Sequence, residues 1–401
     1  MAGVATLTGA LLLTTAPTAS ADYIRDKQWV VDTIDFEKVW KESRGNGVTV
    51  AVIDSGVDSS HPDLTGQVLK GRDFSGQGAG AHDDTESHGT AMASLIAGHG
   101  HGPGKASGVL GLAPDSKILP VKFSVQVNGQ QSNLQLASSI RYAVDAGAEV
   151  INLSGGNSGS PEPEIVEAIH YAQQRDVVLV AATGNEGAAV GSPANVPGVV
   201  AVGAVDANLD IWDRSNQGKE VTLVAPGVDI VSADPNAESG YRQGTGTSDS
   251  AAFVSATAAL IRSKYPDLSA GQVVNRLIKS ATFAHHEIDK RDSKYGYGII
   301  RPWRALAADI PKGPVEGPLP QAPSGPEGQG AGTPQGDGND NSQPQTQGST
   351  SVAIPLAVGT LVALAIIGGV VFAIVRSRAR RRFAGADAHQ AQGPASPTWP
   401  N

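Results

Sequence analysis

The nine residues VTVAVIDSG, at positions 48–56, decide the fold class of this chain. An apolar run that ends in an acidic residue and a glycine is typical of a parallel strand buried on both faces. Four further runs share this character: KILPVKF at 117–123, EVINLSGG at 149–156, VVLVAATGNEG at 177–187 and VVAVGAVDA at 199–207. Segments 132–148 and 162–176 lie between them and space their apolar residues as helices do. We therefore predict an α/β domain built on a parallel sheet.

Polar side chains stand where three of these strands are expected to end. Asp54 ends the first strand, Ser154 ends the third, and Asn185 follows the fourth in the motif TGNEG. Because the carboxyl ends of parallel strands meet at one edge of a sheet, this edge is the favoured place for a functional site. Each of these residues could instead form a turn by bonding to its own backbone, so both interpretations stay open at this point.

Two further motifs supply a base and a nucleophile. His88 in ESHGTAMASLIAG and Ser248 in GTGTSDSAAFVSA each begin a predicted helix, which places the Ser248 N–H at the positive end of a helix dipole. Acyl transfer by a serine needs a base, a carboxylate that orients the base, and donors for the oxyanion. We predict that Asp54, His88 and Ser248 form this triad and that Asn185 completes the oxyanion hole. The alternative is that Ser248 only caps a long apolar helix.

Four motifs together resemble the signatures of the subtilases. They are VAVIDSGVDSSHPDL, SHGTAMASLIAG, VAATGNEG and GTGTSDSAAFVSA, which follow the subtilase order of Asp, His, oxyanion Asn and Ser across about residues 45–304. The resemblance implies a subtilisin-like three-layer α/β fold and serine endopeptidase activity that requires no cofactor for its chemistry. It also implies that Ser154, Gly155 and Gly156 bind a substrate peptide as an added strand.

The serine motif departs from the family pattern. Asp249 stands where subtilases usually have methionine or an aromatic residue, Ser250 replaces a usual alanine, and Ala252 replaces a common proline. A carboxylate in the first turn stabilises a helix by roughly 0.3–1 kcal/mol. Pointing into the site, however, it would oppose the oxyanion, because two charges about 4 Å apart interact by roughly 4 kcal/mol at an effective dielectric of 20. Pointing to the leaving-group side, it would favour basic residues there. We expect activity to survive this substitution.

Metal binding receives less support from the sequence. Many subtilases hold structural calcium, and four acidic residues are candidates by type, but their spacing matches no known ligand loop, so no metal ligands are assigned. These residues are Asp58, Asp63, Asp83 and Asp84. His82, His99 and His101 lie in glycine-rich segments, and we predict that they are solvent-exposed loop histidines rather than zinc ligands.

The segments outside this domain predict a membrane anchor. Residues 1–21 have an apolar middle and end in Ala-Ser-Ala, which indicates a signal peptide. No Lys or Arg precedes the apolar run, so a misplaced start, a weak signal or a buried N-terminal helix all remain open. The remaining predicted segments are an N-terminal extension at 22–47, the peptidase domain at 48–310, a disordered Pro/Gly/Gln-rich linker at 311–350, a transmembrane helix at 352–375 and a basic tail at 376–401.

The arginines that directly follow the predicted span set the expected topology. Basic residues mark the cytoplasmic end of a span, so the peptidase domain is expected on the extracellular side of the bilayer and the C-terminus in the cytoplasm. The formal net charge of −9 leaves no basic surface for nucleic acid beyond this patch. The absence of cysteine excludes thiol nucleophiles and disulfides.

The order of these segments resembles one group of subtilases. The stretch at 23–58, the linker and the single C-terminal span are similar to the mycosins, the membrane-anchored subtilases of actinobacterial type VII secretion. Segment 22–47 is also too short for the folded inhibitory propeptide of most secreted degradative subtilases. The resemblance implies a role in secretion, by cleaving protein or peptide substrates, by supporting the membrane complex, or by both. The alternatives are a weakly active or inactive scaffold and a general degradative subtilase.

Overall fold

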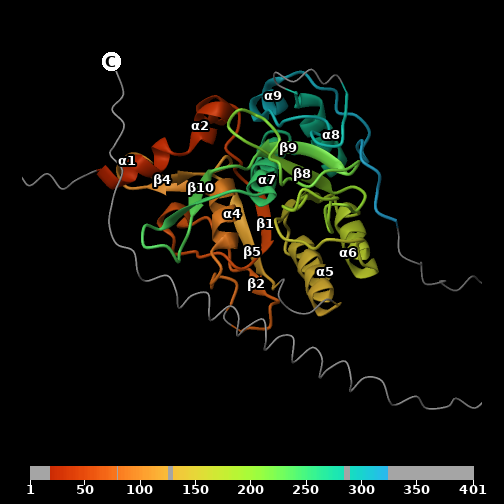
Figure 1. Cartoon of the computed structure of the whole chain (residues 1–401), viewed down its shortest axis with the longest axis horizontal. Coiled ribbons are helices and arrows are strands. Elements are labelled where there is room, and N and C mark those ends of the chain that lie inside the picture. Colours follow the sequence, from red (N-terminus) through yellow and green to blue (C-terminus); the bar gives the residue numbers. More distant parts are fainter. Residues whose placement is uncertain (1–18, 79, 125–129, 284–289, 324–401) are drawn as a thin grey trace, which may run out of the picture. The chain divides into compact units, whose positions relative to one another are not determined.

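The computed structural model describes residues 19–78, 80–124, 130–283 and 290–323 (Figure 1). At its centre lies a parallel sheet of seven strands within the described residues, in the order β2-β5-β1-β6-β7-β8-β9. The strands are β1 (Thr49–Asp54), β2 (Arg72–Asp73), β5 (Lys117–Lys122), β6 (Val150–Leu153), β7 (Val178–Ala182), β8 (Val200–Val205) and β9 (Val221–Pro226). The five strands that the sequence predicts are all present in this sheet, which confirms the predicted α/β class.

Helices cover both faces of the sheet and make a three-layer arrangement (Figure 1). Along β1, Val50 and Val52 pack into the core on one face, while Ala51 and Ile53 pack into the core on the other. The first face is covered by α4 (His88–Ala97), α7 (Thr247–Lys264), α8 (Ala270–Ser280) and α9 (Pro302–Ala307), and the second by α5 (Gln130–Asp145) and α6 (Pro163–Gln173). Because alternate residues of every central strand are buried on opposite faces, the strands read as continuous apolar runs.

Two short hairpins extend the fold beyond the predicted elements. They are β3 (His99–His101) with β4 (Ser107–Leu110), and β10 (Ile230–Ala233) with β11 (Tyr241–Gly244), both antiparallel. The described residues also form two short 3-10 helices, η1 (Pro62–Leu64) and η2 (Pro103–Lys105). These strands carry few branched apolar residues, so their pairing depends on tertiary contacts that local sequence does not reveal.

The N-terminal extension is packed into the domain. Its helices are α1 (Ala19–Asp26), α2 (Trp29–Ile34) and α3 (Phe36–Trp40). Phe36 and Val39 are completely buried in the core that also contains α4 and α7. The side chain of Gln28 donates to the carbonyl of Leu110 at 3.1 Å and accepts from its N–H at 2.9 Å, so it pairs with that backbone like an added strand. The segment therefore contributes to the peptidase core.

Residues 311–323, which the sequence places in the linker, also pack on the domain. Asn275 Nδ2 donates to the carbonyls of Pro311 and Lys312 at 3.0 and 3.2 Å, and Ala322 is only 3% exposed. The ordered domain thus continues beyond residue 310, because α8 supplies donors for this backbone. None of the helices within the described residues has the length and apolar character needed to cross a bilayer. Most of the predicted signal peptide, the rest of the linker, the predicted span at 352–375 and the tail lie outside the described residues.

Candidate active site

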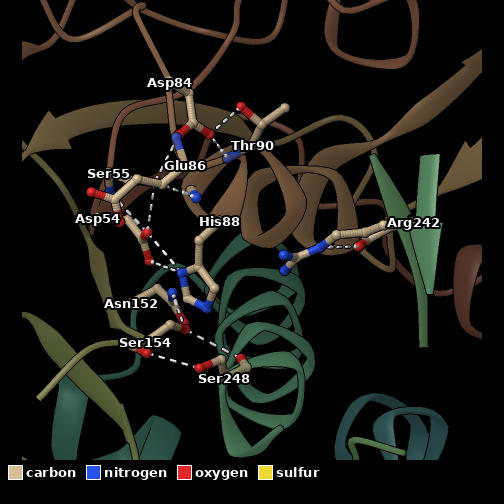
Figure 2. Close-up of polar contacts among 12 residues, drawn as sticks. Asp54, Ser55, Asp84, Glu86, His88, Thr90, Asn152, Ser154, Arg242 and Ser248 are labelled. Carbon is tan, nitrogen blue, oxygen red and sulfur yellow. Dashed lines mark hydrogen bonds and ion pairs between the residues drawn. The ribbon is translucent and has the colours of Figure 1, made fainter. Parts of the chain in front are cut away.

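Asp54 and His88 form a direct pair at the carboxyl edge of the sheet. Asp54 is the last residue of β1, and His88 is the first residue of α4. His88 Nδ1 donates to both carboxylate oxygens of Asp54, at 2.8 and 2.9 Å (Figure 2). The carboxylate is 5% exposed, whereas the imidazole is 32% exposed. This geometry leaves Nε2 as the nitrogen that can exchange a proton in the cleft.

The local electrostatics favour an ion pair. Burial opposes the charge of Asp54, but His88 and the hydrogen bonds from Ser55 outweigh it and hold the pKa of this carboxyl below its ordinary value. Burial also opposes the imidazolium, yet the adjacent Asp54 carboxylate outweighs it and raises the pKa of His88 above its usual range. An imidazole held in this way is suited to act as a base and then as an acid.

A second carboxylate, Asp84, holds this pair in place. Ser55 donates its N–H to Asp54 Oδ1 at 2.8 Å and its hydroxyl to Asp84 Oδ1 at 2.8 Å. The other Asp84 oxygen accepts from the N–H and hydroxyl of Thr90 at 2.8 and 2.6 Å. Asp84 therefore caps the first turn of α4. The N-cap residue of this helix makes no such side-chain hydrogen bond. Sequence analysis missed this role, although the motif DTESHGT places Asp84 one turn before His88.

Ser248 is the second residue of α7 and is tied to the end of β6. Its Oγ donates to the Ser154 carbonyl at 2.8 Å, and Ser154 Oγ donates to the Ser248 carbonyl at 3.2 Å. The His88 ring lies between the Asp54 carboxylate and this serine pair (Figure 2). Within the described part of the chain, His88 and Ser248 share no hydrogen bond. Such bonds are often long in unliganded sites and shorten when substrate binds.

Asn185 lies beside the start of α7. Its Oδ1 accepts from the Thr247 N–H and hydroxyl, both at 2.9 Å. This contact leaves the Asn185 Nδ2 donors without a protein acceptor among the described residues. The N–H of Ser248 belongs to the first helical turn, where no carbonyl of the same helix can accept it. Asn185 and Ser248 line the same cleft, so these two N–H donors are available for the predicted oxyanion hole.

A cleft of about 360 Å³ unites these residues. Every predicted site residue except the buried Asp54 lines it: His88, Ser154, Gly155, Gly156, Asn185 and Ser248. The backbone must be glycine at 156, because a Cβ there would lie 2.2 Å from the Ser192 carbonyl oxygen. The residues that the sequence predicts for the site therefore lie at one cleft in the structure.

The other acidic and histidine residues have separate partners. In the described ranges no three His, Cys, Asp or Glu side chains group as metal ligands would. The prediction of exposed loop histidines is wrong in location for His99 and His101, which lie in β3, and wrong in exposure for His99. His99 is buried in β3, and His101 Nδ1 donates at 2.6 Å to Asp63, which is completely buried. Pairing of β3 with β4 carries His99 inward, whereas the His101 side chain is 37% exposed and His82 is exposed as predicted.

Asp249 is buried and directly follows Ser248 in the chain. The residue is 3% exposed, and its Oδ1 has no hydrogen-bond partner in the described structure. Burial raises the pKa of this carboxyl to about 6, against the opposing effects of His88 and Arg242. The sequence showed the unusual residue type at 249, but it did not reveal that this carboxyl would be buried.

Comparison with known proteins identifies the family to which this chain belongs. The pattern that describes the subtilase family matches residues 45–298, which is more than half of the chain. The chain belongs to the subtilase family. It is therefore a serine-type peptidase. Subtilisin DY of Bacillus licheniformis is 38% identical to this chain over 278 residues, and the match covers 67% of this chain and 95% of that protein. A thermophilic serine proteinase of Bacillus sp. strain AK1 is 38% identical over 255 residues, 63% of this chain, and the match spans 62% of that protein.

Solved subtilase structures superpose well on this one. MycP1 with its N-terminal propeptide removed has a TM-score of 0.63 at 31% identity, covering 72% of this chain and 99% of that chain. MycP3 protease, from the type VII (ESX-3) secretion system, has a TM-score of 0.61 at 32% identity, covering 75% and 91%. A lanthipeptide protease has a TM-score of 0.62 at 28% identity, covering 71% and 95%. The fold of this subtilase is thus shared with the mycosins.

Proposed function

We propose that this subtilase is a membrane-anchored, extracytoplasmic serine endopeptidase whose catalytic residues are Asp54, His88 and Ser248. The observation that carries the catalytic assignment is the two-oxygen contact between Asp54 and His88 Nδ1, next to the cleft that Ser248 lines. This contact fixes the tautomer in which Nε2 is free to accept a proton. Membership of the subtilase family supports the same assignment.

The reaction follows from the positions of these groups. When a peptide binds, the Ser248 hydroxyl turns from the Ser154 carbonyl to His88 Nε2, which takes its proton as Oγ attacks the substrate carbonyl carbon. The resulting oxyanion accepts hydrogen bonds from Asn185 Nδ2 and the Ser248 N–H. His88 then gives the proton to the leaving amine as the peptide bond breaks. Water, activated by the same imidazole, hydrolyses the acyl enzyme.

The backbone that follows β6 offers a place for the substrate. Ser154 to Gly156 extends past the end of the strand and lines the cleft, and only at Asn157 does the chain pair again, with Ser192. An extended peptide beside this segment would add a strand to it, since peptide recognition by strand addition uses main-chain hydrogen bonds. Because residues 155 and 156 are glycine, no side chain of theirs occupies the space that the peptide would need. The substrate class is therefore an extended peptide or protein segment.

Asn185→Ala tests the oxyanion assignment. We expect kcat for a peptide substrate to fall by roughly 10²–10³-fold with little change in KM, because the lost donor acts in the transition state. The matched control is Asn208→Ala, which truncates an exposed asparagine that does not line the cleft. Steady-state kinetics measure kcat and KM for both variants. An unchanged kcat for Asn185→Ala would show that Asn185 is not an oxyanion donor.

The membrane assignment rests on sequence. The uncharged segment 352–375 and the arginines that follow it support a single span with the C-terminus inside. Protease treatment of spheroplasts that carry a C-terminally tagged full chain tests this topology. We expect the peptidase domain to be digested and a small tagged fragment to stay protected until detergent is added. Digestion of the tag in intact spheroplasts would contradict the topology.

The association with type VII secretion rests on the similarity to MycP1 and MycP3. A second candidate, a subtilase-fold scaffold for a secretion complex, is favoured by the buried Asp249 beside Ser248. Complementation of a deletion strain separates the two. If proteolysis is required, Ser248→Ala will fail to restore the processing of secreted substrates. If secretion and processing return fully with Ser248→Ala at normal abundance, the chain acts as a scaffold.

A further inference from the structure

The backbone immediately before His88 is held in an unfavourable conformation. Ser87, which precedes α4, has φ 63° and ψ −6°, in the left-handed region that glycine and asparagine adopt more readily than serine. The residue is only 4% exposed, and its carbonyl accepts a helical hydrogen bond from the Ala91 N–H at 3.1 Å. The direction in which His88 leaves the chain therefore depends on a conformation that other contacts must stabilise.

The contact that stabilises this conformation comes from Asn236, in the turn between β10 and β11. Asn236 Nδ2 donates to the Ser87 hydroxyl oxygen at 2.7 Å and to the Thr85 carbonyl at 3.0 Å. The Asp84 carbonyl oxygen lies 3.4 Å from the same nitrogen. A single amide group therefore binds both the side chain of the left-handed residue and the backbone that leads into it.

The hairpin that carries Asn236 is itself fixed to α4. Asp234 Oδ1 accepts from the Asn236 N–H at 2.9 Å, which orders the turn at the position of the asparagine. The Ala233 N–H, at the end of β10, donates to the hydroxyl of Ser94 in α4 at 3.0 Å. Hairpin and helix are thus joined directly at Ser94, and Asn236 adds a second connection at Ser87.

We propose that Asn236 is a positioning residue that orients the His88 imidazole by holding Ser87 in its left-handed conformation. His88 directly follows Ser87, and its Nδ1 contacts both carboxylate oxygens of Asp54, at 2.8 and 2.9 Å. Rotation of Ser87 out of this conformation would redirect the first turn of α4 and loosen that contact. Asn236 is not among the residues that line the cleft, so it acts through the base. The inference rests on the proposed function, because His88 is the proposed base.

Asn236→Ala in the full-length chain tests the proposal. We expect kcat for a peptide substrate to fall roughly 10-fold while KM stays within about twofold, because a small displacement of a catalytic group costs rate and the cleft stays intact. If this variant folds poorly, Asn236→Asp replaces it, since aspartate has a similar size but no N–H for the Thr85 carbonyl, and kcat should again fall. An unchanged kcat, or a rise in KM alone, would overturn the proposal.

The matched control is Glu238→Ala, which truncates an exposed side chain of the same turn. Glu238 contributes no hydrogen bond to residues 84–87, so both kcat and KM should stay at the wild-type values. A fall in kcat equal to that of Asn236→Ala would show that any change in this turn disturbs the site, and it would reject a specific role for Asn236.

Ser87→Gly separates action through Ser87 from a general loss of stability. Glycine enters the left-handed region without steric cost, and it lacks the hydroxyl that Asn236 binds. In the Ser87→Gly background we expect Asn236→Ala to change kcat by less than about threefold, against roughly 10-fold in the wild-type background. An equal fall in both backgrounds would show that Asn236 does not act through Ser87, and the proposal would be wrong.

The pH profile gives a readout that a merely structural role would not move. Burial lowers the pKa of His88, and the adjacent Asp54 carboxylate outweighs it and raises that pKa above its usual range. A loosened contact should therefore lower the pKa of His88 in Asn236→Ala, and the acid limb of kcat/KM should move to lower pH. A smaller amount of folded enzyme would reduce the rate at every pH and leave the limb in place, which would contradict the proposal.

Failure of the proposed function has a distinct signature. A folded wild-type chain that hydrolyses no peptide at any pH would remove the peptidase assignment. The Nδ1 proton of His88, bonded to Asp54, can still be followed by NMR as the pH is changed. A titration that moves to lower pH in Asn236→Ala, but not in Glu238→Ala, would keep the proposal for His88. Identical titrations in the wild type and Asn236→Ala would reject it.

Discussion

Ser248→Ala is expected to reduce kcat/KM for peptide hydrolysis by roughly 10⁴–10⁶-fold. In the proposed mechanism the Ser248 hydroxyl oxygen attacks the substrate carbonyl, so its removal takes away the nucleophile. The substitution removes one hydrogen bond, to the Ser154 carbonyl, so the free energy of unfolding should change by only about 1 kcal/mol. Hydrolysis of a casein-derived peptide by the purified full-length chain measures the loss.

Ser250→Ala is the matched control. Ser250 is buried in the same helical turn, and its hydroxyl donates to the carbonyls of Ala225 and Pro226 at 2.9 and 3.1 Å, away from His88. This variant should keep kcat/KM within a few-fold of the wild type. Equal hydrolysis by the wild type and Ser248→Ala would show that the activity belongs to a contaminating peptidase or to another residue.

Asp54→Asn has the second largest expected effect, a fall of roughly 10⁴-fold in kcat. An asparagine amide can donate to Nδ1, which would then become an acceptor, so the His88 proton would move to Nε2 and block acceptance of the Ser248 proton. The loss of the negative charge would also lower the pKa of His88, whose value Asp54 raises against the effect of burial. Kinetics across pH measure both effects.

The pH profile separates these two consequences of the substitution. In the wild type, the acid limb marks deprotonation of His88, and activity rises as pH rises through its raised pKa. In Asp54→Asn the limb should move to lower pH while the plateau stays low, because the ring is neutral but carries its proton on the wrong nitrogen. A plateau within tenfold of the wild type would contradict the role of Asp54.

The candidate site residues could be picked out from the sequence because each of them marks the boundary of an element. Asp54 and Ser154 end buried strands, which places them at one edge of the sheet, and the resemblance to subtilase motifs added His88 and Ser248, which begin helices. The same reasoning missed Asp84 and its contacts with Ser55 and Thr90, since side-chain hydrogen bonds between loops leave no periodic pattern.

Other features depend on contacts between distant segments. Arg242 lies opposite Ser232 because β11 pairs with β10, and the sequence YRQG carries little strand character. His101 is drawn toward buried Asp63 by a hairpin that its glycine-rich sequence does not predict. The packing of Pro311 on Asn275 likewise involves backbone carbonyls, which any sequence would supply.

The central claim is that Ser248 is a nucleophile activated by His88 and Asp54. The most direct measurement is to treat the folded full-length chain with a fluorophosphonate and to locate the adduct by peptide mass spectrometry. We expect a single adduct on Ser248 that forms at neutral pH and is nearly absent from His88→Ala. A correctly folded chain that remains unlabelled, or that carries the adduct on another residue, would contradict the claim.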